Sequence, residues 1–110
     1  MTVKVLENLT AFKRVVNNPT KTRFFVVALV PNWSKLSEDC LENYSIISKL
    51  FKDKVNFYQL EVGLCDELTK TYGVRDVPTL LIFNTENTVV ASSFGKYTLD
   101  YLQDFIFQSV

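Results

Sequence analysis

The most constraining feature of the chain is an apolar run from Arg23 to Val30 that is followed closely by a long helical pattern. The run is rich in β-branched and aromatic residues and does not alternate with polar ones. Such a run is typical of a central strand that is buried on both faces, as in a sheet covered by helices. The sequence therefore predicts an α/β fold in which helices flank a central sheet.

The rest of the chain repeats this alternation of strand and helix signals. Asn8 and Thr98 are suited to cap the helices that follow them, and Gly73 suits the end of the third helix. Expected strands cover 3–6, 23–30, 55–62, 79–83 and 88–92. Expected helices cover 8–16, a segment from 34 or 37 to 52, 66–72 and the residues after Thr98. The order is βαβαβαββα, which predicts parallel strands first and a closing antiparallel hairpin, hence a mixed sheet.

Two of the expected helices carry an apolar stripe that should face the sheet. The stripe members recur at steps of three and four residues, which places them on one side of a helix. They are Leu36, Cys40, Tyr44, Ile47 and Phe51 in the second helix, and Leu99, Leu102, Phe105 and Ile106 in the last.

Composition limits the class of protein. The chain has 110 residues with 47% hydrophobic residues, which suits a single domain over residues 1–110. Lys plus Arg and Asp plus Glu number 12 each, so the balanced charge favours neither nucleic acid nor an anionic membrane as a partner. No apolar run is long enough for a membrane span, and the N-terminus lacks the apolar core of a signal peptide. We expect a cytoplasmic protein.

The chemistry available to the chain is also limited. It contains no histidine, which removes the usual general base at neutral pH and most transition-metal sites. Its two cysteines, Cys40 and Cys65, do not form a disulfide framework. For Cys40 the sequence favours packing in the core over a redox role, and Cys65 is the candidate for a redox role. No cofactor and no metal are expected.

Two segments carry a resemblance to the thioredoxin family. The first is Trp33-Ser34-Lys35-Leu36-Ser37, between the central strand and the second helix, and the second runs from Tyr72 through Val77-Pro78 to Phe83. The resemblance extends over essentially the whole chain and implies the thioredoxin fold. It places Ser34 and Ser37 at the two positions of the family's catalytic Cys-x-x-Cys dithiol.

The resemblance also implies a peptide-binding surface. In the family, the proline equivalent to Pro78 follows a cis peptide bond, which leaves the backbone groups of the preceding residue free to pair with an extended peptide. The positions that correspond to this surface are Trp33, Val62, Asp76, Val77, Pro78, Phe94 and Gly95.

The catalytic positions differ from the family pattern in a coherent way. A serine hydroxyl barely ionises at neutral pH and cannot form a disulfide, so the expected site has no catalytic residue. The resemblance places Ala28 where thioredoxins keep a buried aspartate and Gln59 where a lysine usually pairs with it. Ser34 or Ser37 is then best interpreted as a helix cap.

These observations favour a redox-inactive thioredoxin-like domain that serves as a protein- or peptide-binding adaptor or as a subunit of a larger assembly. The alternative is a thiol–disulfide oxidoreductase, either a thioredoxin whose dithiol was deliberately replaced by serines or an atypical enzyme that uses Cys65. A structural subunit with its interface elsewhere, for example on the last helix, is a third possibility. The oligomeric state is not predicted.

Overall fold

The computed structural model describes residues 3–18, 23–30, 35–61, 66–74, 79–95 and 98–110. Within these ranges the elements follow the order expected from the sequence. The strands are β1 (Val3–Leu6), β2 (Phe24–Val30), β3 (Val55–Glu61), β4 (Thr79–Phe83) and β5 (Val89–Phe94). The helices are α1 (Leu9–Val16), α2 (Lys35–Leu50), α3 (Asp66–Thr71) and α4 (Leu99–Ser109).

The strands form one mixed sheet in the order β1-β3-β2-β4-β5. β3 pairs in parallel with both β1 and β2. β4 pairs antiparallel with β2 on one side and with β5 on the other. The expected α/β architecture and mixed sheet are therefore confirmed, with β2 in the centre as its apolar run predicted.

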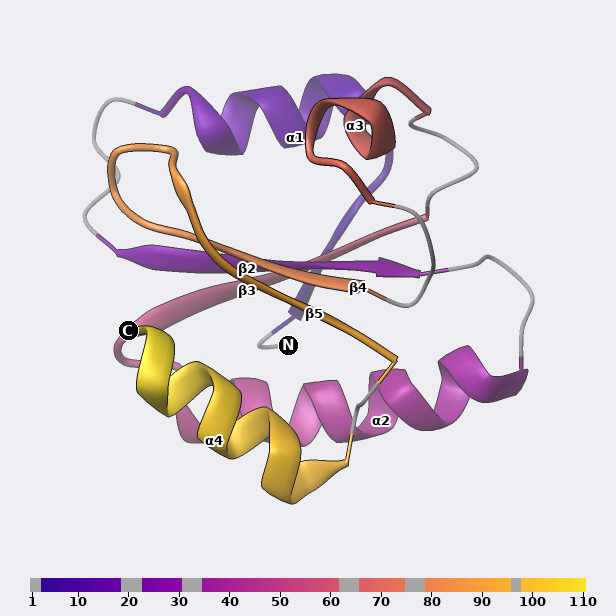
Figure 1. The fold of residues 1–110 in the computed structure, drawn as a ribbon, viewed down its shortest axis with the longest axis vertical. Helices are drawn as coiled ribbons and strands as arrows, with labels where there is room; N and C mark the ends of the chain where they lie inside the picture. Colours follow the sequence, from indigo (N-terminus) through magenta and orange to yellow (C-terminus); the bar gives the residue numbers. More distant parts are fainter. Residues whose placement is uncertain (1–2, 19–22, 31–34, 62–65, 75–78, 96–97) are drawn as a thin grey trace.

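Helices cover both faces of the sheet (Figure 1). α1 and α3 lie on one face, where Phe12 packs with Leu29, Leu81 and Phe83. α2 and α4 lie on the other, where Tyr44 and Ile47 of α2 and Leu102 and Ile106 of α4 are fully buried. Since β2 contributes side chains to both layers, it needs apolar residues at consecutive positions rather than at alternate ones.

Local sequence explains where the helices begin. The side chain of Asn8 accepts a hydrogen bond from the backbone N–H of Ala11 at 2.9 Å, and that of Thr98 accepts one from Tyr101 at 3.3 Å. Both are N-caps, which satisfy backbone donors that have no partner inside the helix. Gly73, after α3, has a φ of +66°, the left-handed conformation that favours glycine.

The hairpin between β4 and β5 is held by Asn84. Its side-chain oxygen accepts hydrogen bonds from the backbone N–H groups of Glu86 at 2.9 Å and Thr88 at 3.0 Å. Asn87 adopts a φ of +68°, which asparagine tolerates better than most residues. The polar link expected between these two strands is therefore an ordered turn that is stabilised by its own hydrogen bonds.

Several element boundaries and one side-chain orientation differ from the sequence prediction, most of the boundaries by a single residue. α2 ends at Leu50 rather than at Lys52, because the chain turns there to enter β3 and the backbone N–H groups of Lys54 and Val55 both bond to the carbonyl of Phe51. β5 extends to Phe94 rather than ending at Ser92, because its partner β4 begins at Thr79 and Thr79 pairs with Phe94.

The inward orientation expected for Leu99 is wrong. Leu99 is 40% exposed, whereas Leu102 and Ile106 are buried and Phe105 packs partly against the same layer. Leu99 is the first residue after the N-cap, and the side chains that reach the sheet are those one turn or more further along α4. Of the stripe expected on α2, Tyr44 and Ile47 are buried and Phe51 packs partly against the core.

Among the residues that the structure describes, none belongs to a helix that is both long enough and apolar enough to cross a membrane.

Candidate functional site

The sheet brings four separated segments of the chain to one edge. Leu60, Leu29, Thr79 and Phe94 are neighbours in that order across β3, β2, β4 and β5. β2 and β3 end just beyond this row, and β5 ends at it. β4 begins at the row instead, because it is antiparallel to both of its neighbours. The residues that the sequence analysis selected therefore follow or precede this row directly in the chain.

Phe94 is the one aromatic side chain of the expected surface that the structure describes. It is 56% exposed although it is the last residue of a strand in the sheet. Gly95 follows with a φ of +75°, and a Cβ atom built there would meet nothing within 4 Å. Glycine is thus suited to position 95 by backbone conformation rather than by lack of space.

A cavity of about 340 Å³ lies beside Phe94. It sits between the end of α3 and the strands β4 and β5. Its lining residues are Tyr72, Gly73, Val74, Thr79, Leu81, Ser92, Ser93 and Phe94. The mixture of apolar walls with a few hydroxyl groups is the usual character of a binding pocket.

Of the residues that line this cavity, only Phe94 was predicted from the sequence as a site residue. Thr79 and Ser92 were treated as ordinary strand residues, and Tyr72 and Val74 as part of the segment that carries the family resemblance. The pairing register of β4 and β5 could have indicated these residues. Residues at alternate positions of two paired strands face the same side of the sheet.

Most of the other expected site residues lie outside the described residues. Ser37 belongs to α2, but its side chain is not described. The same holds for Cys40. The predictions that concern Trp33, Ser34, Val62, Cys65, Asp76, Val77 and Pro78, including a cis bond before Pro78, also concern residues that are not described.

The two positions expected for proton transfer are described. Ala28 is fully buried in the apolar layer that also contains Val26, Tyr44 and Leu80. Gln59 is its neighbour on β3 and is half-buried. Ala28 carries only a methyl group, so position 28 itself offers no group that could take up or release a proton.

Two tyrosines near the sheet have perturbed acidity. Partial burial raises the pKa of the Tyr72 phenol above its ordinary value, and burial does the same for Tyr58. A tyrosine phenol with the ordinary pKa of 10.0 is already protonated at neutral pH, and burial shifts the pKa of both phenols further from neutrality. Within the described part of the chain no three Asp, Glu or Cys side chains gather closely enough to hold a metal ion.

The order of strands and the two helical layers define the thioredoxin fold. The chain belongs to the thioredoxin family, whose sequence pattern matches residues 3–108. Its fold is similar to that of the solved structure of thioredoxin from Malassezia sympodialis, described as the allergen Mala s 13. The TM-score is 0.81 and the identity 23%, over 97% of this chain and 90% of the other. No curated protein matches the chain.

Proposed function

We propose that this member of the thioredoxin family is redox-inactive and binds a protein or an extended peptide at the edge of the sheet marked by Thr79 and Phe94. The observation that carries the proposal is the environment of Ala28. The family resemblance assigns a buried aspartate to this position, and the chain has a fully buried methyl group there, packed within a cluster of apolar side chains.

The absence of the buried aspartate is what the absence of the two thiols leads us to expect. A buried carboxylate without a partner costs several kcal/mol of desolvation, and that cost serves a function only where a thiol needs a nearby proton acceptor. Once Ser34 and Ser37 replace the thiols, an alanine at position 28 removes the cost. Deliberate replacement of two cysteines would have left the aspartate in place.

The exposed surface supports the binding part of the proposal. Phe94 exposes more than half of a large apolar side chain next to a cavity of about 340 Å³. Exposed aromatic side chains beside a pocket are typical anchors in protein interfaces. Val77 and Pro78 directly precede Thr79 in the chain, so the backbone pairing that the family resemblance implies would lie at the same edge.

Further parts of the proposal rest on the sequence. Trp33, Val62 and Asp76 would contribute to the same surface, and the protein would act as an adaptor or as a subunit of an assembly. With two cysteines that form no framework, a reducing compartment such as the cytoplasm suits the chain.

A second candidate function is thiol–disulfide exchange, which family membership favours as much as it favours binding. In that case Cys65 would act alone, or Ser34 and Ser37 would stand where the native protein has cysteines. A lone cysteine can form mixed disulfides but cannot resolve them without a second thiol.

Reduction of insulin disulfides separates the two functions. We compare the chain itself, Cys65→Ser, the double variant Ser34→Cys/Ser37→Cys, and the triple variant that adds Ala28→Asp. The proposal expects no turnover by the chain, weak turnover by the double variant, and higher turnover by the triple variant because the proton acceptor is restored.

Two outcomes would contradict the proposal. Turnover by the unmodified chain that disappears in Cys65→Ser would assign catalysis to Cys65. Full thioredoxin-like activity of the double variant, without any gain from Ala28→Asp, would show that the remainder of the active site is intact and that the serines alone silence it.

A further inference from the structure

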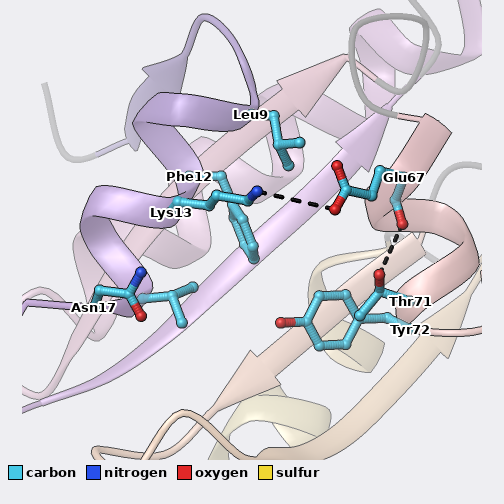
Figure 2. Close-up of a pocket in the computed structure, with 8 residues that line it drawn as sticks. Leu9, Phe12, Lys13, Asn17, Glu67, Thr71 and Tyr72 are labelled. Carbon is cyan, nitrogen blue, oxygen red and sulfur yellow. Dashed lines mark hydrogen bonds and ion pairs between the residues drawn. The ribbon is translucent and has the colours of Figure 1, made fainter.

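A second cavity, of about 410 Å³, lies between α1 and α3 (Figure 2). It is on the face of the sheet opposite α2 and α4, and it does not include Phe94 or Thr79. Its volume is in the range of sites that bind small molecules. Neither the family resemblance nor the proposed peptide-binding surface accounts for it.

The inner wall of this cavity is apolar and aromatic. Leu9 and Phe12 project from α1, and the ring of Tyr72 faces them from the end of α3 (Figure 2). The rings of Phe12 and Tyr72 meet edge to face with centroids 6.1 Å apart, and Tyr72 packs in the same manner on Phe83 at 5.3 Å. These contacts hold the ring of Tyr72 in place, and because Phe12 is buried, the half-buried Leu9 and Tyr72 provide the apolar surface that a ligand can reach.

Two opposite charges border the cavity. The Lys13 ammonium comes from α1 and the Glu67 carboxylate from α3, and Nζ and Oε1 are 3.9 Å apart (Figure 2). This separation is long for an ion pair, and the two side chains are 57% and 66% exposed. Exposed pairs of this kind contribute little to stability, so a ligand can separate the two charges at small cost.

We propose that this cavity binds a small zwitterion with an aromatic side group, of the chemical class of a free aromatic amino acid. The ligand carboxylate would pair with Lys13 and its ammonium with Glu67, so that two ion pairs replace one. The ring would lie against Leu9 and Tyr72, with the buried Phe12 behind them. A ligand with a single charge would satisfy only one of the two protein groups, which is the basis of the selectivity.

The proposal is tested by NMR titration of the labelled full chain with L-phenylalanine. For a ligand of this size in an open cavity we expect a Kd on the order of 1 mM. Saturable shifts should centre on amides of Leu9 to Asn17 and of Glu67 to Tyr72. L-phenylalaninamide, which lacks the carboxylate, and 3-phenylpropionate, which lacks the ammonium, should each bind more weakly by roughly two- to fivefold.

Matched variants test the role of each charge. Lys13→Gln should weaken binding of L-phenylalanine and abolish its advantage over the amide, and Glu67→Gln should abolish its advantage over 3-phenylpropionate. The controls are Lys49→Gln and Glu42→Gln, which remove exposed charges of the same types from α2 on the other face of the sheet. They should bind like the unmodified chain.

Three results would overturn the proposal. One is the absence of saturable shifts at tenfold the expected Kd. Another is equal affinity for the three ligands, which would mean that the charges play no part. The third is a set of shifts centred on Ser92 to Phe94, because Tyr72 borders both cavities and the ligand would then occupy the other one.

Discussion

The hydroxyl of Tyr44 lies 2.6 Å from the backbone carbonyl oxygen of Tyr58, although Tyr44 belongs to α2 and Tyr58 to β3. The same hydroxyl is 3.2 Å from the carbonyl oxygen of Val26 on β2. Tyr44 is fully buried, and its hydroxyl donates to a backbone carbonyl oxygen of the sheet, so this polar tip has a partner inside the core. The contact attaches the middle of α2 to the sheet.

Replacement of Tyr44 by phenylalanine should lower the free energy of unfolding by about 1 kcal/mol, the usual net value of one hydrogen bond. The ring would still fill its place, so the fold should be retained. Urea denaturation followed by circular dichroism measures the change. Tyr72→Phe is the control, since its ring is only half-buried, and it should change stability by less than about 0.5 kcal/mol. Equal stability of Tyr44→Phe and the unmodified chain would mean that the contact adds nothing.

Introduction of an acid at position 28 should make stability depend on pH. Burial in the apolar layer around Ala28 would raise the folded-state pKa of the new Asp carboxyl above its unfolded value of about 3.9. Below that unfolded value the carboxyl is neutral in both the folded and the unfolded state, and the substitution destabilises the fold least. As the pH rises, only the unfolded state ionises freely, so stability falls up to the raised pKa.

The measurement is the free energy of unfolding of Ala28→Asp at several values of pH between about 3 and 7. The loss of unfolding free energy in Ala28→Asp, relative to the unmodified chain, should increase by roughly 3 kcal/mol from the lowest to the highest pH. The isosteric control Ala28→Asn should be destabilised without this pH dependence. A parallel pH response in the two variants would show that water reaches position 28.

Truncation of Phe94 should weaken peptide binding without changing stability. Phe94 is exposed, so Phe94→Ala leaves no buried cavity, and its effect on unfolding should be within about 0.5 kcal/mol. Peptides selected against the unmodified chain from a random phage-displayed library serve as the probe. Loss of an interface anchor should reduce their affinity by about 2 kcal/mol, or roughly thirtyfold.

The matched control for this prediction is Phe107→Ala. Phe107 is an exposed phenylalanine on α4, outside the row of residues that ends at Phe94. Selected peptides should bind this variant normally. If they instead lose affinity for Phe107→Ala and keep it for Phe94→Ala, the interface is on the last helix and the protein is better described as a structural subunit.

Alkaline pH should destabilise the fold through its tyrosines. Burial raises the folded-state pKa of Tyr58 and of Tyr72 above the ordinary value of 10.0. Each phenol therefore adds stability that is fully present below pH 10 and is lost as the pH rises through the raised folded-state value. Phenolate absorbance and unfolding curves recorded together should show this loss, and Tyr58→Phe/Tyr72→Phe should reduce it. An unchanged alkaline response in the double variant would assign the effect to other groups.

Periodicity and capping residues were sufficient to predict the order of the elements. The consecutive apolar residues of 24–30 identified the central strand, and Asn8 and Thr98 marked two helix starts correctly. These signals are local, because propensity, capping and the period of the apolar pattern act within a few residues of the chain. The family resemblance adds the prediction that Ser34 and Ser37 stand at the dithiol positions and Ala28 at the position of the buried aspartate.

Contacts between distant residues could be decided only in three dimensions. The pairing of Thr79 with Phe94 extended β5 beyond the weak strand formers Ser92 and Ser93, because a backbone ladder depends on its partner strand as well as on its own residues. The cavity between α1 and α3 had no signal in the sequence, since Lys13 and Glu67 are 54 positions apart and meet only through the packing of their helices on one face of the sheet.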